Sequence, residues 1–292
     1  MNAIEFVGAR ITDLGNGLQV RRLLPTRQRR MVGAWCFLDH AGPLEAGAGG
    51  MHVGAHPHTG LQTFTWLIEG EVLHRDSLGS EQLIRPGQVN LMTAGRGIVH
   101  TEDSLPGTGR LHLAQLWIAL PASVADCAPA FDHYPDLPCW DESGCSFTLL
   151  AGDYCGRSAP ARLYSPLLGM DICSGAGAPI DIALRRDFEY AILPLSGSVT
   201  IDGQTCATDK LAYLGQGRST VALHPSADCR MLLLGGEPFA TPVLMWWNFV
   251  GRDKAGIAAA QHAWESGDAR FGRVNGDAGR RLVAPRLPWS GI

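Results

Sequence analysis

The sequence predicts an all-β protein built from two β-barrel domains of the jelly-roll type, with one short helix near the C-terminus. The 292 residues include 36 Gly and 18 Pro, a turn-rich composition that suits many short strands. Short apolar runs bounded by turn residues recur in both halves of the chain, which is typical of sandwiches and barrels. The chain length corresponds to two domains of ordinary size.

In the N-terminal half, the expected strands alternate with turn signals such as Pro86-Gly87 and Gly95-Arg96-Gly97. These strands are Trp35–Leu38, Leu61–Glu71, Val72–Asp76, Gln82–Ile84, Val89–Thr93 and Leu111–Leu120. A hairpin is expected around Gly15-Asn16-Gly17, because Asn and Gly tolerate positive φ. The Gly- and Ala-rich segment Ala41–Gly54 is expected to be a loop.

The segment Asp126–Gly144 contains several prolines and acidic residues, and is predicted to be the inter-domain linker. The predicted domains are residues 1–130, with a metal site, and residues 131–292, without one. Strands are expected again from Ser146 to Leu234. Asp253 is a suitable N-cap for a helix over Lys254–Glu265, with an apolar stripe at helical spacing.

Charge and cysteine content narrow the range of functions. The net charge of −4 provides no general attraction to nucleic acid or anionic membranes, so neither is expected as a partner. No signal peptide or membrane-spanning apolar run is apparent. The eight cysteines lack a Cys-x-x-Cys pair, and we expect free thiols in a reducing cytoplasm. Five arginines within Arg21–Arg30 suggest either a phosphate-binding patch or, more simply, a solvated strand edge that discourages aggregation between sheets.

Four residues form a candidate metal site: His56, His58, His100 and Glu102. Each pair has the spacing i, i+2, which places both side chains on one face of a β-strand. Two such strands in a barrel would direct three imidazoles and one carboxylate toward one point. This ligand set suits Fe, Mn, Ni, Cu, Co or Zn. In an octahedral shell, two positions would remain for water, substrate or dioxygen.

The second half lacks an equivalent site. Aligning Gly197 with Gly70 places Ala183 opposite His56 and Arg185 opposite His58. His224 has no histidine partner at the i, i+2 spacing. Only the first domain is therefore expected to bind metal.

The site lies among motifs that resemble the pirin family of the cupin superfamily. They are Asp39-His40-x-Gly42-Pro43, His56-Pro57-His58-x-Gly60, Met92-Thr93-Ala94-Gly95-Arg96-Gly97-Ile98-x-His100-x-Glu102 and Trp246-Trp247-Asn248-Phe249-Val250-Gly251-Arg252. The resemblance implies a bicupin fold, one divalent metal, most simply Fe(II), on the four ligands, and a metal-free C-terminal domain. Gln62 stands where many pirins have Glu. An amide is no general base, but it can orient a ligand as a second-shell residue.

The resemblance implies two functions of different classes. The first is a quercetin 2,3-dioxygenase type of oxidoreductase, acting on a flavonol or similar enol with O₂; no catalytic side chain is assigned. The alternative is an iron-dependent, redox-sensing binding protein or transcriptional co-regulator without turnover. Its partner would be a protein, and the arginines of Arg21–Arg30 would be a candidate contact surface.

Overall fold

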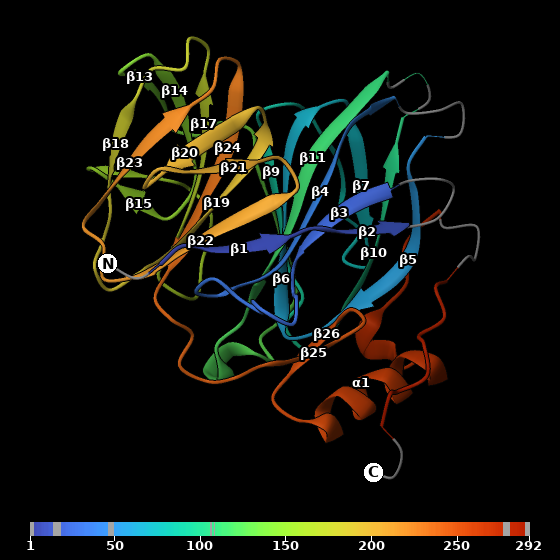
Figure 1. Cartoon of the computed structure of the whole chain (residues 1–292). Helices are drawn as coiled ribbons and strands as arrows, with labels where there is room; N and C mark the ends of the chain where they lie inside the picture. Colours follow the sequence, from blue (N-terminus) through green and yellow to red (C-terminus); the bar gives the residue numbers. More distant parts are fainter. Residues whose placement is uncertain are drawn as a thin grey trace. The chain divides into compact units, whose positions relative to one another are not determined.

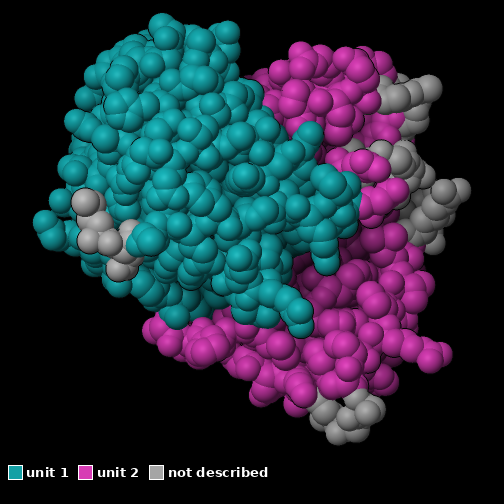
Figure 2. Space-filling view, in the orientation of Figure 1, with its two compact units in different colours: residues 1–12, 20–40, 136–239 teal, residues 13–19, 41–135, 240–292 magenta. Residues whose placement is uncertain are grey.

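The computed structural model describes residues 3–13, 19–45, 50–105, 107, 109–276 and 281–289. The chain forms two compact units, coloured separately in Figure 2. Unit 1 comprises residues 1–12, 20–40 and 136–239, and unit 2 comprises residues 13–19, 41–135 and 240–292. One boundary, between residues 135 and 136, lies near the predicted boundary between residues 130 and 131. The division of the chain into residues 1–130 and 131–292 stays a prediction.

Unit 1 is built from antiparallel sheets (Figure 1). Its larger sheet has the order β1 (Glu5–Gly8), β22 (Lys210–Gln216), β19 (Glu189–Ser196), β24 (Cys229–Gly236), β17 (Leu167–Ser174), β14 (Cys145–Ala151) and β13 (Cys139–Glu142). Its smaller sheet has the order β18 (Ile180–Ala183), β23 (Thr220–Pro225), β20 (Ser198–Ile201) and β21 (Gln204–Ala207). A short pair joins β15 (Asp153–Tyr154) to β16 (Arg157–Ser158). Alternate residues of β23, such as Val221 and Leu223, are buried in the core of this unit.

Unit 2 contains the sheet that carries the candidate site. Its order is β5 (His52–His58), β10 (Ile98–Ser104), β7 (Val72–Asp76) and β8 (Glu81–Ile84). A second sheet includes β12 (Ala130–Tyr134), β9 (Val89–Thr93), β6 (Leu61–Glu69) and β11 (Arg110–Ala119). The remaining elements of this unit are the 3₁₀ turns η1 (Ala122–Val124) and η2 (Ala269–Phe271), the hairpin β25 (Leu244–Trp246) and β26 (Phe249–Gly251), and helix α1 (Lys254–Ser266). Three strands cross a boundary between the units: β2 (Arg10–Asp13), β3 (Gln19–Leu24) and β4 (Trp35–Glu45).

These elements confirm the all-β prediction and the C-terminal helix. The side chain of Asp253 accepts a hydrogen bond from the Gly256 N–H at 2.7 Å, as expected of an N-cap. Three apolar side chains of α1 are buried, namely Ile257, Ala260 and Trp264. They belong to a core that also includes Ala55, Val99 and Phe249 of the same unit.

The predicted linker Asp126–Gly144 is wrong in part, because it contains β12 and β13. β12 pairs with β9, and β13 pairs with β14. The prolines lie just outside these strands: Pro129 precedes β12, Pro135 follows it, and Pro138 precedes β13. Proline is tolerated at strand ends because no ladder hydrogen bond is lost there.

The predicted loop Ala41–Gly54 is likewise shorter than expected, since β4 extends to Glu45 and β5 begins at His52. The predicted turn Gly15-Asn16-Gly17 lies outside the described residues. None of the eight cysteines forms a disulfide. Within the described ranges, no helix has both the length and the apolar character needed to cross a bilayer.

Candidate metal centre

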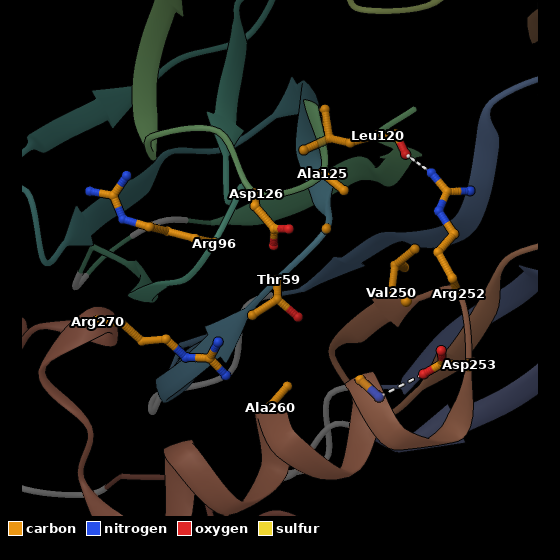
Figure 3. Close-up of a pocket in the computed structure, with 13 residues that line it drawn as sticks. Thr59, Arg96, Leu120, Ala125, Asp126, Val250, Arg252, Asp253, Ala260 and Arg270 are labelled. Carbon is orange, nitrogen blue, oxygen red and sulfur yellow. Dashed lines mark hydrogen bonds between the residues drawn. The ribbon is translucent and has the colours of Figure 1, made fainter. Parts of the chain in front are cut away.

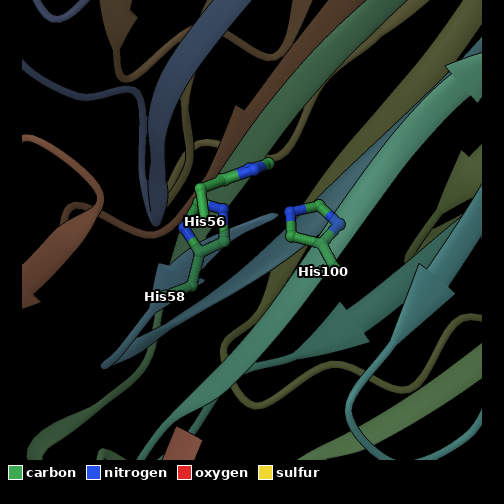
Figure 4. Close-up of side chains that lie close together, drawn as sticks. All are labelled: His56, His58 and His100. Carbon is green, nitrogen blue, oxygen red and sulfur yellow. The ribbon is translucent and has the colours of Figure 1, made fainter. Parts of the chain in front are cut away.

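Three histidines from two neighbouring strands converge in unit 2, as the sequence predicts. His56 and His58 lie on β5 and His100 lies on β10, directly opposite His56 in the antiparallel register. The ring centroids are 4.3 Å apart for His56 and His100, 5.0 Å for His56 and His58, and 5.1 Å for His58 and His100 (Figure 4). One ligand nitrogen from each ring lies within 4.8 Å of the others. This spacing is compatible with a single shared metal ion.

Backbone carbonyls orient two of the three rings. The Nδ1 atom of His56 lies 2.9 Å from the carbonyl oxygen of Gly54, and Nδ1 of His58 lies 3.2 Å from that of Asn248. A carbonyl oxygen only accepts hydrogen bonds, so each Nδ1 carries the proton and each Nε2 keeps its lone pair. This arrangement is the usual one for a histidine that binds metal through Nε2.

His100 has a different neighbour. Its Nδ1 lies 3.3 Å from Nδ1 of His74, on the adjacent strand β7. Its Nε2 is buried and has no hydrogen-bond partner among the described residues. A buried nitrogen without a partner is costly, and binding a cation would remove that cost. The three histidines therefore fit a transition-metal ion.

Burial also sets the charge of the three rings. It lowers the pKa of His56 to about 4, and it lowers the pKa values of His58 and His100 well below the ordinary range. Repulsion from the neighbouring imidazoles acts in the same direction for His58 and His100. Neutral imidazole is the form that binds metal, so no proton need be displaced at neutral pH.

The fourth predicted ligand, Glu102, lies in a different part of the cluster. A bulge between His100 and Glu102 shifts the pairing of β10 with β5, and Glu102 lies opposite His74 on β7. Ligand atoms of Glu102, His74 and His100 lie within 4.8 Å of one another. Burial raises the pKa of the Glu102 carboxyl. Coordination by Glu102 together with the three histidines stays a prediction.

Sequence reasoning missed His74, which is buried on the same sheet. Its Nε2 lies 3.2 Å from Oδ2 of Asp76, and its ring stacks on Phe131 with centroids 4.3 Å apart. The signal was present, because His74 and Asp76 share the i, i+2 spacing within a strand that was predicted.

Gln62 lies on β6 and is completely buried. Its Nε2 donates to the Thr93 hydroxyl at 2.9 Å. This hydrogen bond fixes the side-chain orientation and leaves the carbonyl oxygen as the end able to accept. The second-shell role of Gln62 stays a prediction.

A pocket of about 260 Å³ lies beside the end of β5 in the same unit (Figure 3). Thr59, which directly follows His58, and three arginines, Arg96, Arg252 and Arg270, line it. One of the arginines, Arg252, donates to the Leu120 carbonyl at 2.9 Å. The pocket includes none of the three histidines, and we assign it no part in metal binding.

Comparison with known proteins identifies the family. The pirin model matches residues 17–118, and the model of the pirin C-terminal cupin domain matches residues 169–272. The chain belongs to the pirin family. A protein of Pseudomonas aeruginosa, provisionally named a quercetin 2,3-dioxygenase, is 58% identical over 98% of this chain and 91% of its own length. A pirin-like protein of Caulobacter vibrioides is 38% identical over 89% of this chain and 92% of its own length.

Solved structures share the fold of this chain. The crystal structure of a quercetin 2,3-dioxygenase from Acinetobacter baumannii matches with a TM-score of 0.96 and 46% identity, covering 99% of this chain and 97% of that chain. The Escherichia coli pirin YhhW in complex with nickel(II) matches with a TM-score of 0.65 and 20% identity, over 81% of this chain and all of that chain (100%). The latter similarity concerns the fold alone. Together with the two pirin models, these matches confirm the predicted bicupin fold.

Proposed function

We propose that this pirin is a metal-dependent dioxygenase of the quercetin 2,3-dioxygenase type, acting on a flavonol or a similar enol with O₂. The observation that carries the proposal is the convergence of three buried, neutral imidazoles with an unpartnered Nε2 on His100. Similarity to proteins named as quercetin 2,3-dioxygenases supports the reaction class. We place the protein in the cytoplasm, with a small-molecule substrate as its main partner.

The proposed ligands are His56, His58, His100 and Glu102. Fe(II) is the first candidate, followed by Mn, Ni, Cu, Co and Zn, because imidazole and carboxylate accept all of these ions. Such an ion, when bound, supplies Lewis acidity toward an enolic oxygen and, for the redox-active ions, electrons for O₂ chemistry.

The protein residues prepare this site in three ways. Carbonyls of Gly54 and Asn248 aim two imidazoles, so the site need not reorganise on binding. The ring of Trp117 lies edge-on to His58, with centroids 5.0 Å apart, and packs against this proposed ligand. Gln62 would orient a bound enol by hydrogen bonding. It would not act as a general base, because its amide does not take up a proton near neutral pH.

The test is anaerobic loading of metal-free protein with each candidate ion, followed by measurement of oxygen uptake with quercetin. We expect uptake that depends on both quercetin and metal, and no uptake by metal-free protein. Loading is checked independently by metal analysis. Stoichiometric metal binding without oxygen uptake for any ion would contradict the dioxygenase. Capture of a protein partner that changes with the oxidation state of bound iron would then favour the redox-sensing alternative.

A further inference from the structure

Behind His100 lies a buried chain of polar groups that the proposed reaction does not use. His100 Nδ1 lies 3.3 Å from His74 Nδ1, and His74 Nε2 lies 3.2 Å from Asp76 Oδ2. The side chains of His74 and Asp76 are 4% and 0% exposed, so water cannot substitute for either contact. The chain runs across two strands, since His100 lies directly opposite Asp76 in the β10–β7 register.

Asp76 is held from its other side by the turn that follows β7. Its Oδ1 accepts hydrogen bonds from the backbone N–H of Leu78 at 2.8 Å and of Ser80 at 3.1 Å. The remaining oxygen, Oδ2, therefore faces His74 in a fixed direction. Stacking on Phe131, with an interplanar angle of 13°, holds the plane of the His74 ring.

One arrangement of protons along these hydrogen-bonded groups leaves a lone pair on Nε2 of His100 for a metal ion. An ionised carboxylate only accepts, so His74 must donate from Nε2. A neutral His74 then has a lone pair on Nδ1, which accepts a hydrogen bond from Nδ1–H of His100. His100 is left with a lone pair on Nε2, the atom that has no hydrogen-bond partner among the described residues.

We propose that Asp76 and His74 are positioning residues that set the tautomer of His100 and direct its Nε2 lone pair toward the metal. The inference rests on the proposed metal centre and deepens it. Asp76 and His74 do for His100 what the carbonyls of Gly54 and Asn248 do for the other two ligands. Because the partner here is a carboxylate acting through an imidazole, it also makes His100 a more basic ligand.

The decisive pair of variants is Asp76→Asn and His74→Gln, made in the full chain. In Asp76→Asn, Oδ1 still accepts from Leu78 and Ser80, but Nδ2 now donates to His74. His74 then carries its proton on Nδ1, which opposes Nδ1–H of His100 and favours the wrong tautomer of the ligand. In His74→Gln, Nε2 can donate to Asp76 while Oε1 accepts from His100, so the direction of hydrogen bonding from His100 to Asp76 is kept.

We expect Asp76→Asn to weaken binding of Co²⁺ or Zn²⁺ by about 10- to 100-fold, and His74→Gln to stay within a few-fold of wild type. Affinity is measured by competition with a chromophoric chelator, and the number of bound histidines by the absorption spectrum of the Co²⁺ form. Nitrogen-15 spectra of labelled histidine report the His100 tautomer directly. Asp181→Asn, at an exposed position on β18, is the matched control.

Three outcomes overturn the inference or the function beneath it. Wild-type protein that binds neither ion refutes the proposed metal centre itself. Asp76→Asn with wild-type affinity, in a wild-type protein that does bind, refutes the positioning role alone. Loss of a ligand from the Co²⁺ spectrum in His74→Gln would make His74 a ligand and likewise refute that role. If Asp76→Asn does not fold, His74→Phe takes its place, because it removes the acceptor while keeping a ring on Phe131. Weaker metal binding by His74→Phe than by His74→Gln would support the positioning role, and equal binding would refute it.

Discussion

At the scale of single residues, burial and hydrogen bonding have two separate effects on the same three imidazoles. Burial disfavours the protonated ring, which keeps His56, His58 and His100 neutral. Partners on Nδ1 then decide which nitrogen of each neutral ring is bare. A site that is both neutral and correctly oriented needs little rearrangement to accept a divalent ion.

Replacing one of these rings should remove metal binding without unfolding the protein. We expect His58→Ala to lower the affinity for Zn²⁺ by more than about 100-fold, because it removes a direct ligand rather than an outer partner. His262→Ala, at an exposed position on α1, is the matched control and should bind as wild type. Equal affinity of the two variants, measured by chelator competition, would rule out His58 as a ligand.

The same burial makes the metal-free protein sensitive to acid. Between pH 6.5 and about 4, the unfolded chain binds a proton at His56 that the folded chain does not, so the free energy of unfolding falls as pH falls. The shift at His56 corresponds to roughly 3 kcal/mol, fully present above pH 6.5 and lost as pH approaches about 4. Urea unfolding of metal-free protein across this range measures the slope. His58→Phe, which replaces one titrating ring with an apolar one, should give a shallower slope, and an unchanged slope would contradict the argument.

At the scale of elements, the end of β5 is held in place by a glycine. Gly60 has φ +71°, and a Cβ there would overlap the carbonyl oxygen of Val250. Its N–H donates to the Gly95 carbonyl at 2.9 Å, and its own carbonyl accepts from Leu120 N–H at 3.0 Å. This turn comes two residues after His58, so it fixes where that imidazole lies.

Gly60→Ala should therefore destabilise the protein by at least about 2 kcal/mol, combining left-handed strain with a backbone collision. Gly87→Ala separates the two effects, because Gly87 has φ +82° but open space around its Cα. We expect only about 1 kcal/mol for Gly87→Ala. Chemical denaturation measures both, and equal costs would show that the collision is relieved by movement of Val250.

Strand periodicity predicted that three histidines lie together, but it did not predict their surroundings. The i, i+2 rule requires only a local strand, which is why His56, His58 and His100 were found from the sequence. The position of Glu102 depends on a bulge in β10 and on which strand lies beside it, and neither is encoded in a local pattern. The predicted linker Asp126–Gly144 was wrong in part for a similar reason. Composition does not distinguish a linker from two strands with prolines at their ends.

At the scale of the whole molecule, each compact unit combines segments far apart in the sequence. Unit 2 joins residues 41–135, which hold every proposed ligand, to residues 240–292. The carbonyl of Asn248 orients His58, the N–H of Val250 donates to the Thr59 carbonyl at 3.0 Å, and Phe249 pairs with Thr59. Such long-range pairing could not be inferred from turn signals and periodicity, which describe neighbours along the chain.

This arrangement predicts that a core residue remote in sequence from all four proposed ligands affects metal affinity. Phe249 is fully buried and contacts the rings of Trp247 and Phe271. Phe249→Ala should cost about 3–5 kcal/mol of stability and should also weaken Zn²⁺ binding, since it loosens the segment that orients His58. Phe147→Ala makes the same truncation in the core of unit 1 and should cost similar stability with unchanged affinity. Affinities of both variants are compared at a temperature where both are folded. Equal weakening of Zn²⁺ binding in the two variants would mean that metal affinity depends on the stability of the whole protein rather than on packing within unit 2.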